Sequence, residues 1–154
     1  MSYANDMPTV ENIARTDAGL ASVLRISVMR LRRRLTNERH PENDLSLGSM
    51  AVLGALYAND DMTLGELAAR ERVQPPSMTR TVNYLEEAGY VTRRPGDVDR
   101  RQVIVSITPK GRKTVRADRA SRDAWLAQRL SELTPDEIDV IRRAAPILER
   151  IATS

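Results

Sequence analysis

The chain has 154 residues, no cysteine, one histidine and a formal net charge of +3 at pH 7. This length suits one domain with a core of its own. The sequence contains no apolar run of the roughly 18 residues that a membrane helix needs, and no visible signal peptide. It also lacks an HExxH motif, a P-loop and a glycine-rich nucleotide motif. A cytoplasmic protein that is not an enzyme and holds no metal or cofactor is therefore the first expectation.

The N-terminal third of the chain predicts a polar arm followed by two helices. Residues 1–16 are polar and mixed, which favours a flexible arm. From about residue 17 to residue 37, apolar side chains recur on one helix face. The members of this stripe are Leu20, Val23, Leu24, Ser27, Leu31 and Leu35. After a linker at residues 40–44, Ser46 is a suitable N-cap for a helix that extends to about Ala58.

Two short helices separated by a tight turn are predicted in the middle of the chain. Thr63 and Glu66 form a capping box for a helix that ends near Arg72. The prolines at positions 75 and 76 interrupt that helix and suit the first turn of the next one, from about Pro75 to Ala88. Gly89 is a typical helix stop. The inward stripe of the second helix is Met78, Val82 and Leu85.

The remaining face of the second helix carries side chains that suit a DNA groove. Ser77 and Thr79 are small hydroxyl residues that can approach phosphates closely. Arg80 can reach a phosphate or a guanine edge, and Asn83 can pair with a base edge. The alternative interpretation is an ordinary solvated helix surface, and the helix alone does not separate the two.

A hairpin rich in arginine favours the DNA interpretation. Residues 90–92 and 103–107 have strand character, and Pro95-Gly96 marks a turn between them. Four arginines flank this short hairpin, at positions 93, 94, 100 and 101. Crowded like charges suit a polyanion, and a thin hairpin can enter a minor groove. Arg94, Arg100 and Arg101 are therefore candidate DNA contacts, although a solvated charged hairpin remains the alternative.

Two acids in the hairpin, Asp97 and Asp99, are interpreted as internal partners that orient neighbouring arginines. The basic charge is also concentrated in one segment of the chain. Residues 93–119 contain nine basic and three acidic side chains, a local charge of +6, so the rest of the chain has a net charge of −3.

The C-terminal part predicts two further helices, each begun by a Thr-Pro pair. Thr108 and Pro109 begin a helix that extends to about Leu130, and Thr134 and Pro135 begin the last one. The apolar stripe of the last helix is Ile138, Ile141, Ala145, Leu148 and Ile151. The short helices and the hairpin in the middle of the chain are too small to bury all these terminal apolar faces. A homodimer built from the terminal helices is therefore expected. Internal packing within one chain is the alternative.

Three segments together resemble the MarR family of bacterial transcriptional regulators. They are residues 85–91 (LEEAGYV), 97–101 (DVDRR) and 106–111 (SITPKG), with Ile107 in place of the usual leucine. The resemblance implies a mainly α fold with a small β-hairpin wing. Its winged helix-turn-helix domain would occupy residues 46–107, with dimerisation helices at residues 17–45 and 108–154. It also implies that Arg101 enters the minor groove and that Asp99 orients it.

The resemblance further implies a dimeric regulator, expected to be a repressor, that binds double-stranded DNA at an inverted repeat and responds to a small aromatic or lipophilic ligand. A ligand site is expected where the terminal helices meet the winged domain. Its candidate residues are Leu24, Val28, Met50, Tyr57 and Arg119, with Leu31, Leu53 and Val115 nearby. The alternatives are that these residues form ordinary core, and that the winged domain serves as a protein-interaction adaptor without binding DNA.

Overall fold

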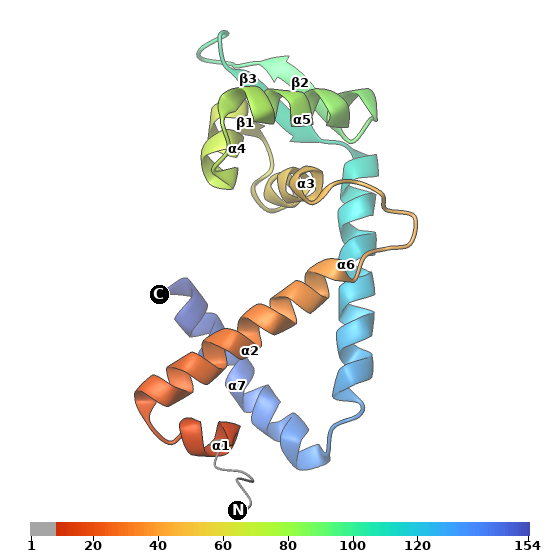
Figure 1. Cartoon of the computed structure of the whole chain (residues 1–154). Helices are drawn as coiled ribbons and strands as arrows, with labels where there is room; N and C mark the ends of the chain where they lie inside the picture. The colour runs from red at the N-terminus through yellow and green to blue at the C-terminus, as the bar shows by residue number, and fades with distance from the viewer. Residues whose placement is uncertain (1–8) are drawn as a thin grey trace, which may run out of the picture. The chain divides into compact units, whose positions relative to one another are not determined.

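Residues 9–154 are described by a computed structural model, in which they form two compact units (Figure 1). One unit consists of residues 39–124, and the other joins residues 9–38 to residues 125–154. Residues 1–8, half of the arm expected from the sequence, lie outside the described residues. Each unit has its own helices, and the long helix α6 contributes to both.

The unit of residues 39–124 contains the predicted helix-turn-helix and wing. Its elements are α3 (Leu47–Asn59), β1 (Met62–Thr63), α4 (Leu64–Glu71), α5 (Pro75–Glu87), β2 (Val91–Pro95), β3 (Val103–Ile107) and the first part of α6 (Pro109–Leu130). The three predicted helices of this unit and the start of α6 are confirmed to within about a residue at each end. Thr63 and Glu66 form the predicted capping box, with both reciprocal hydrogen bonds present.

The wing belongs to a three-stranded antiparallel sheet in the order β1-β3-β2. The hairpin of β2 and β3 was predicted, but β1 was not. Met62 pairs with Val105, and Thr63 pairs with Ile104. A strand of two residues is too short to show an alternating pattern, so only the pairing with β3 identifies it. The third strand anchors the base of the wing beside the start of α4.

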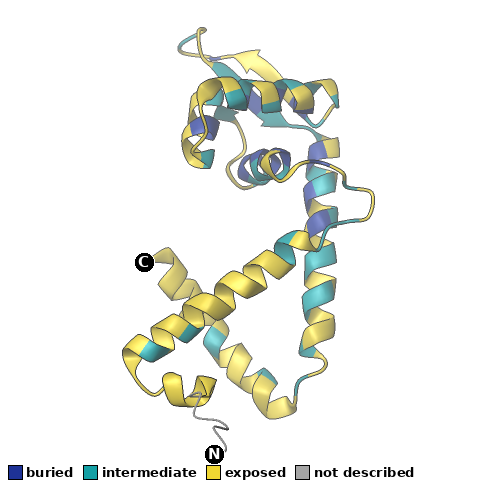
Figure 2. Ribbon diagram, viewed as in Figure 1, coloured by how far each residue is buried: buried dark blue, intermediate teal, exposed yellow. Residues whose placement is uncertain are grey.

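Apolar burial in this unit determines which face of α5 points outward. The predicted stripe of α5 is confirmed as core: Met78, Val82 and Leu85 are all buried. They pack with residues of α3, α4 and the sheet in one cluster, whose other fully buried members include Leu53, Leu56, Leu67 and Val105. Figure 2 shows the buried positions gathered in this part of the molecule. Because one face of α5 is committed to the core, its polar face is presented to solvent.

The end of α5 is fastened to the beginning of α6. Gly89 adopts a φ of 81°, a left-handed conformation that favours glycine, directly after the helix. The Thr108 hydroxyl donates to the main-chain oxygen of Gly89 at 2.7 Å. Lys110 Nζ donates to the oxygen of Ala88 at 2.6 Å and lies 4.3 Å from the centroid of the Tyr90 ring. These contacts satisfy carbonyls that the helix end would otherwise leave open.

The other unit contains α1 (Val10–Ile13), α2 (Asp17–Asn37), the end of α6 and α7 (Pro135–Thr153). The short helix α1, capped by the hydroxyl of Thr9, lies within the segment expected to be a flexible arm. The cap and one helical turn formed by Val10–Ile13 were not anticipated because four residues show no periodicity. The predicted helices α2 and α7 are confirmed. No helix of the described residues is both long and apolar enough to cross a bilayer.

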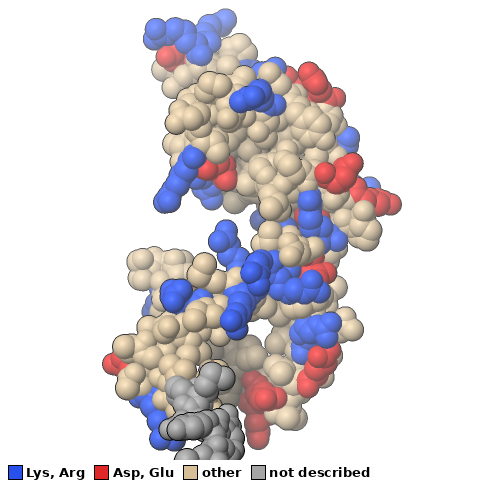
Figure 3. All heavy atoms as spheres, viewed as in Figure 1, with Lys and Arg blue, Asp and Glu red and all other residues tan. Residues whose placement is uncertain are grey.

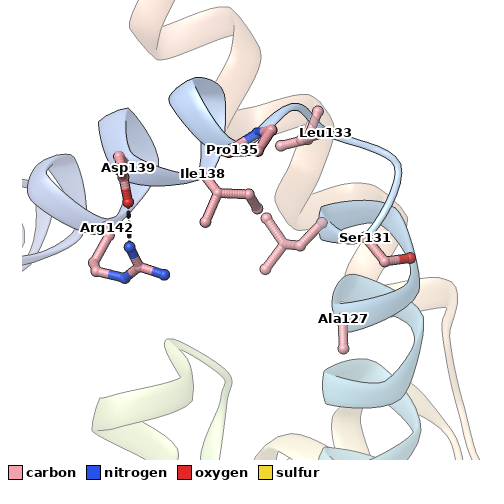
Figure 4. A pocket seen from close by; sticks show the side chains of 8 residues that line it. Ala127, Ser131, Leu133, Pro135, Ile138, Asp139 and Arg142 are labelled. Carbon is pink, nitrogen blue, oxygen red and sulfur yellow. Dashed lines mark hydrogen bonds and ion pairs between the residues drawn. The ribbon is translucent and has the colours of Figure 1, made fainter.

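Apolar side chains of this second unit remain exposed. Among its described residues none is buried, and α2 and α7 appear largely exposed in Figure 2. The large apolar side chains exposed on α2 and α7 include Leu20, Leu24, Val28, Met29, Leu31, Val140, Ile141, Ile147, Leu148 and Ile151. A depression of about 530 Å³ lies where α6 ends and α7 begins. Figure 4 shows Ala127, Leu133 and Ile138 among the side chains that line it. The unit therefore has helices without a closed core.

Candidate nucleic-acid interface

The outward face of α5 presents the polar side chains singled out in the sequence. Arg80 is exposed and forms no ion pair with any described residue. Ser77 and Thr79 are partly exposed, and the Thr79 hydroxyl donates to the oxygen of Pro75 at 3.0 Å. Because its single proton is already donated to that oxygen, the hydroxyl can donate to a phosphate only by rotating away from Pro75. Arg80 is thus the free cation of this helix face.

The N-terminus of α5 offers few backbone donors of its own. Pro75 and Pro76 have no N–H, and the N–H groups of Ser77 and Met78 already donate to the oxygen of Gln74 at 2.9 and 3.2 Å. A helix N-terminus with free N–H groups can bind a phosphate directly. Here contact with an anion depends on side chains instead, above all on Arg80.

Asn83, predicted to contact a base, is engaged by the wing. Its Oδ1 accepts a hydrogen bond from Arg93 Nη1 at 2.6 Å. The same guanidinium donates through Nε to Glu86 Oε2 at 2.8 Å, and its Nη2 lies 2.6 Å from that oxygen. The hydrogen bond from Arg93 is the largest influence that lowers the pKa of the Glu86 carboxyl below its usual value. Helix α5 and strand β2 are thereby joined on their outer side.

The wing tip is a tight turn at residues 96–102. The N–H of Gly96 donates to the oxygen of Gln102 at 2.9 Å, and the N–H of Gln102 donates to the oxygen of Asp99 at 3.0 Å. A Cβ atom added to Gly96 would collide with the main-chain oxygen of Asp99. The turn therefore requires glycine at this position, because the collision is with backbone that cannot move aside alone.

The two acids of the wing pair with arginines, as the sequence predicted. Asp99 Oδ1 accepts from the main-chain N–H of Arg101 at 3.0 Å and from its Nε at 3.2 Å. The Arg101 side chain is still 93% exposed. Asp97 accepts from Arg94 Nη1 at 2.9 Å. The hydrogen bonds from Arg101 lower the pKa of the Asp99 carboxyl, which stays ionised at neutral pH.

Arg94 has a second carboxylate partner that lies far from it in sequence. Its Nη2 is 3.2 Å from Asp61 Oδ2, next to strand β1. A hydrogen bond from Ser106, followed by that from Arg94, lowers the pKa of Asp61. Arg94 thus connects strand β2 of the wing to Asp61 beside β1, and its charge is balanced by Asp61 and Asp97. Arg100 is exposed and forms no ion pair with any described residue.

These pairings place the available positive charge at the end of the wing. The arginines on strand β2 are balanced by acids, whereas Arg100 has no acidic partner among residues 9–154 and Arg101 is held by Asp99 with its side chain extended into solvent. Figure 3 shows basic side chains gathered at the wing tip, at the top of the view. An exposed, narrow and positively charged turn suits the minor groove of DNA.

The predicted ligand residues divide between the two units. Leu24 and Val28 are exposed on α2, whereas Met50, Tyr57 and Arg119 belong to the unit of residues 39–124. Leu53 and Val115, named beside them, are buried in the core, with 0% and 3% exposure. For these two residues the structure agrees with the alternative that the sequence left open, in which they form ordinary core.

Tyr57 lies beside Arg119, which was named with it as a candidate ligand residue, and beside Arg112 and Arg116, which were not. Its hydroxyl accepts from Arg116 Nε at 3.2 Å, and the guanidinium carbon of Arg119 lies 4.4 Å from the centroid of its ring. The hydrogen bond from Arg116 is the largest cause that lowers the pKa of the Tyr57 phenol, and charges on Arg116, Arg119 and Arg112 add to it. This cluster concentrates positive charge beside an aromatic face.

Sequence reasoning missed the partners that hold the site together. Glu86 and Arg93 are seven residues apart, and Asp61 and Arg94 are 33 residues apart. A charge pattern along one helix cannot reveal pairs between different elements. The only available signal was the number of acids around an arginine-rich hairpin, and it does not indicate which acid meets which arginine.

Comparisons with known proteins agree with this geometry. The sequence model of the MarR family matches residues 43–102. An HTH-type transcriptional regulator of Mycobacterium leprae is 45% identical over 133 residues, which cover 86% of this chain and 92% of that protein. The crystal structure of a transcriptional regulator protein from Pseudomonas aeruginosa superposes with a TM-score of 0.78 at 31% identity, covering 90% of this chain and 96% of that one.

A further solved structure is similar in fold and contains DNA. The crystal structure of FabT from Streptococcus pneumoniae in complex with DNA superposes with a TM-score of 0.59 at 23% identity, covering 87% of this chain and 94% of that one. The helix-turn-helix, the wing and the extensive match to a curated regulator agree with one another. The chain belongs to the MarR family of HTH-type transcriptional regulators, which are DNA-binding proteins and not enzymes.

Proposed function

We propose that this regulator is a homodimer that binds an inverted-repeat operator and represses transcription until a small ligand releases it. The observation that carries the proposal is the placement of exposed cations on one domain. Arg80 lies on the outward face of α5, and Arg100 and Arg101 lie at the wing tip. A helix in the major groove and a wing in the minor groove would use both sets of cations.

The contacts in this proposal have distinct roles. Ser77 and Thr79 would position α5 on the phosphate backbone. Arg80 is the best candidate to read a base, because a free guanidinium can contact guanine O6 and N7 together. Arg101 would enter the minor groove with Asp99 fixing its orientation, and Arg100 would contact phosphate. Arg94 pairs with the carboxylates of Asp61 and Asp97 and so supports the wing. Its contribution to DNA affinity would come through the position of the wing.

Exposed apolar faces support the homodimer. Helices α2 and α7 each expose large apolar side chains, among them Leu31 at 43%, Ile141 at 43% and Leu148 at 38%. Exposed apolar patches of this extent on a helical unit mark an interaction surface, and a second copy of the chain carries the same surfaces. A two-fold dimer would bury both sets and would give each half of an inverted repeat its own winged domain. A bound dimer over a promoter would exclude polymerase, which makes repression the expected direction.

Selection from a random DNA library tests operator binding. The unmodified protein should enrich an inverted repeat and should bind it much more tightly than a scrambled duplex at the same salt concentration. Arg80→Ala should lower the preference for one base pair in each half-site, worth about 1–3 kcal/mol for a good bidentate pair. Recovery of no enriched sequence, together with equal affinity for scrambled DNA, would refute sequence-specific binding.

The cluster around Tyr57 supports an anionic aromatic effector. Arg119 is exposed, lies over the Tyr57 ring and forms no ion pair with any described residue, so it can hold a carboxylate while the ring stacks on the ligand. Met50 is half-buried against the core nearby in sequence. Such a ligand acts only through a difference in its affinity for the two states of the regulator.

A titration with salicylate tests the effector site. Salicylate should bind the free protein and weaken operator binding, and the operator should weaken salicylate binding by the same factor. Arg119→Ala should abolish the response, whereas Lys113→Ala on the same helix should preserve it. If a panel of aromatic acids and phenols changes neither the melting temperature nor operator binding, the effector proposal fails and the DNA-binding proposal is unaffected.

A further inference from the structure

The guanidinium of Arg93 spans two residues of α5 that lie one turn apart. It contacts Asn83 Oδ1 at 2.6 Å through Nη1 and Glu86 Oε2 at 2.8 Å through Nε. The main-chain N–H of Arg93 also donates to Glu86 Oε1 at 3.2 Å. A planar guanidinium that donates to two side chains at once is restricted in orientation. Its charge is balanced by a carboxylate and is not free for a phosphate.

This arrangement engages the amide oxygen that Asn83 would use to read adenine. Bidentate pairing needs the amide oxygen of asparagine to accept from N6 and its nitrogen to donate to N7. Arg93 uses one of the two lone pairs of the Asn83 oxygen and restrains the orientation of the amide. Asn83 therefore has a partner within the protein where the sequence alone indicated a partner in the DNA.

The position of Arg93 in the sheet gives the contact its consequence. Arg93 lies on β2 opposite Val105 of β3, and the wing turn begins at Gly96, directly after β2 ends. The core holds the inner faces of α5 and the sheet through Val82, Leu85 and Val105. The contact of Arg93 with α5 joins the same two elements on their outer, solvent-facing side. The wing is thus fixed to α5, the proposed recognition helix, by the core on the inner side and by Arg93 on the outer side.

We propose that Arg93 is a positioning residue that sets the distance between the recognition helix and the wing through Glu86 and Asn83. This inference rests on the proposed operator binding by α5 and the wing. DNA presents its major and minor grooves at a fixed spacing, so a regulator that uses both gains affinity when its two contacts are already spaced to match. Loss of the Arg93 contact should weaken the contact of α5 with the major groove and that of the wing with the minor groove together. Base preference should not change.

Glu86→Gln gives the sharpest test, because electrostatics and positioning predict opposite signs. Removal of a negative charge near DNA should tighten binding if charge alone matters. The positioning role predicts weaker binding, by roughly three- to tenfold, because glutamine loses the charged partner of Arg93. Glu87→Gln is the matched control: Glu87 is exposed on the same helix and forms no ion pair with any described residue. Equal tightening by both variants would overturn the proposal.

Two further variants separate the fork from the charge. Arg93→Lys keeps the charge but cannot contact Glu86 and Asn83 together, so it should weaken binding about as much as Glu86→Gln. Asn83→Ala should weaken all operator variants by the same factor and leave base preference intact. Full affinity for the lysine variant, or a changed base preference for the alanine variant, would contradict the positioning role.

A measurement without DNA distinguishes failure of this inference from failure of the proposed function. Amide hydrogen exchange in residues 91–105 of the free protein should become faster in Glu86→Gln and unchanged in Glu87→Gln. Unchanged exchange in both variants would refute the contact as a restraint on the wing, whatever the DNA results. If the unmodified protein enriches no sequence while the exchange result holds, the proposed operator binding fails and the restraint on the wing stands.

Discussion

Asp99 holds Arg101 through its main chain and its side chain at once: Oδ1 accepts from the N–H of Arg101 at 3.0 Å and from its Nε at 3.2 Å. Two hydrogen bonds to one acid two residues earlier restrict the direction of the arginine while leaving it 93% exposed. In the proposed operator complex, the acid would hold the arginine ready for a narrow groove, although its own charge opposes DNA.

That relationship predicts that loss of either residue weakens operator binding. Arg101→Ala should lower affinity strongly by removing the minor-groove contact. Asp99→Ala should also lower affinity, despite removing a negative charge from the wing, because Arg101 loses its orientation. Fluorescence anisotropy at fixed salt concentration measures both. Tighter binding by the Asp99→Ala protein would defeat the orienting role and leave a purely electrostatic one.

Gly96→Ala should damage the wing while sparing the core. The added methyl group would collide with the main-chain oxygen of Asp99 and open the turn. We expect operator affinity to fall by about tenfold or more, with little change in melting temperature, because the wing tip lies outside the core. Gly54→Ala is the control: its Cβ meets nothing within 4 Å, and it should stabilise α3 by about 0.5–1 kcal/mol. Unchanged affinity for Gly96→Ala would show that the turn tolerates the methyl group.

Operator binding should be nearly independent of pH between pH 6 and 8. Hydrogen bonds from Arg93 and Arg101 lower the pKa values of Glu86 and Asp99 from their ordinary values of 4.5 and 3.8. A carboxylate with a lowered pKa contributes fully above its unfolded value, and its contribution is lost as the pH falls through the folded value. Both losses therefore occur well below pH 6. A steep fall in affinity between pH 6 and 8 at constant ionic strength would show that another group controls the interface.

A charge on the apolar face of α7 should separate dimer and DNA binding from folding of the winged domain. Leu148 is 38% exposed in the single chain and would be buried in the proposed dimer. Leu148→Asp should give a monomer by sedimentation and lose tight operator binding, while the helical content of the winged domain remains. Glu149→Gln on the next, exposed position should change neither property. A monomeric unmodified protein at micromolar concentration would remove the dimer from the account.

Local chemistry made much of the fold predictable. The Thr-Pro pairs at residues 108–109 and 134–135 and the capping box of Thr63 and Glu66 depend on residues a few positions apart, and each begins a helix where expected. The stripe of Met78, Val82 and Leu85 was readable because α5 is amphipathic. The pairing of Asp99 with Arg101 was predictable for the same reason, since the two residues are neighbours.

Features that depend on distant partners were not predictable. Strand β1 exists because Met62 and Thr63 find β3, about 40 residues later in the chain. The hydrogen bond from Arg93 to Asn83 likewise requires α5 and β2 to lie side by side. Neither element's sequence predicts that arrangement. Leu53 and Val115 look similar in sequence to residues of an apolar ligand site, and only packing shows that they belong to the core.

The spacing of two half-sites tests the central claim of a dimer on an inverted repeat most directly. The measurement is the affinity and stoichiometry of the protein on its selected inverted repeat, compared with the same duplex carrying five extra base pairs between the halves. Recognition helices of a two-fold dimer meet successive major grooves about 10 base pairs apart, so the insertion turns one half-site to the opposite face. We predict two chains per original duplex and a loss of tight binding after the insertion. Equal affinity for both duplexes would contradict the account.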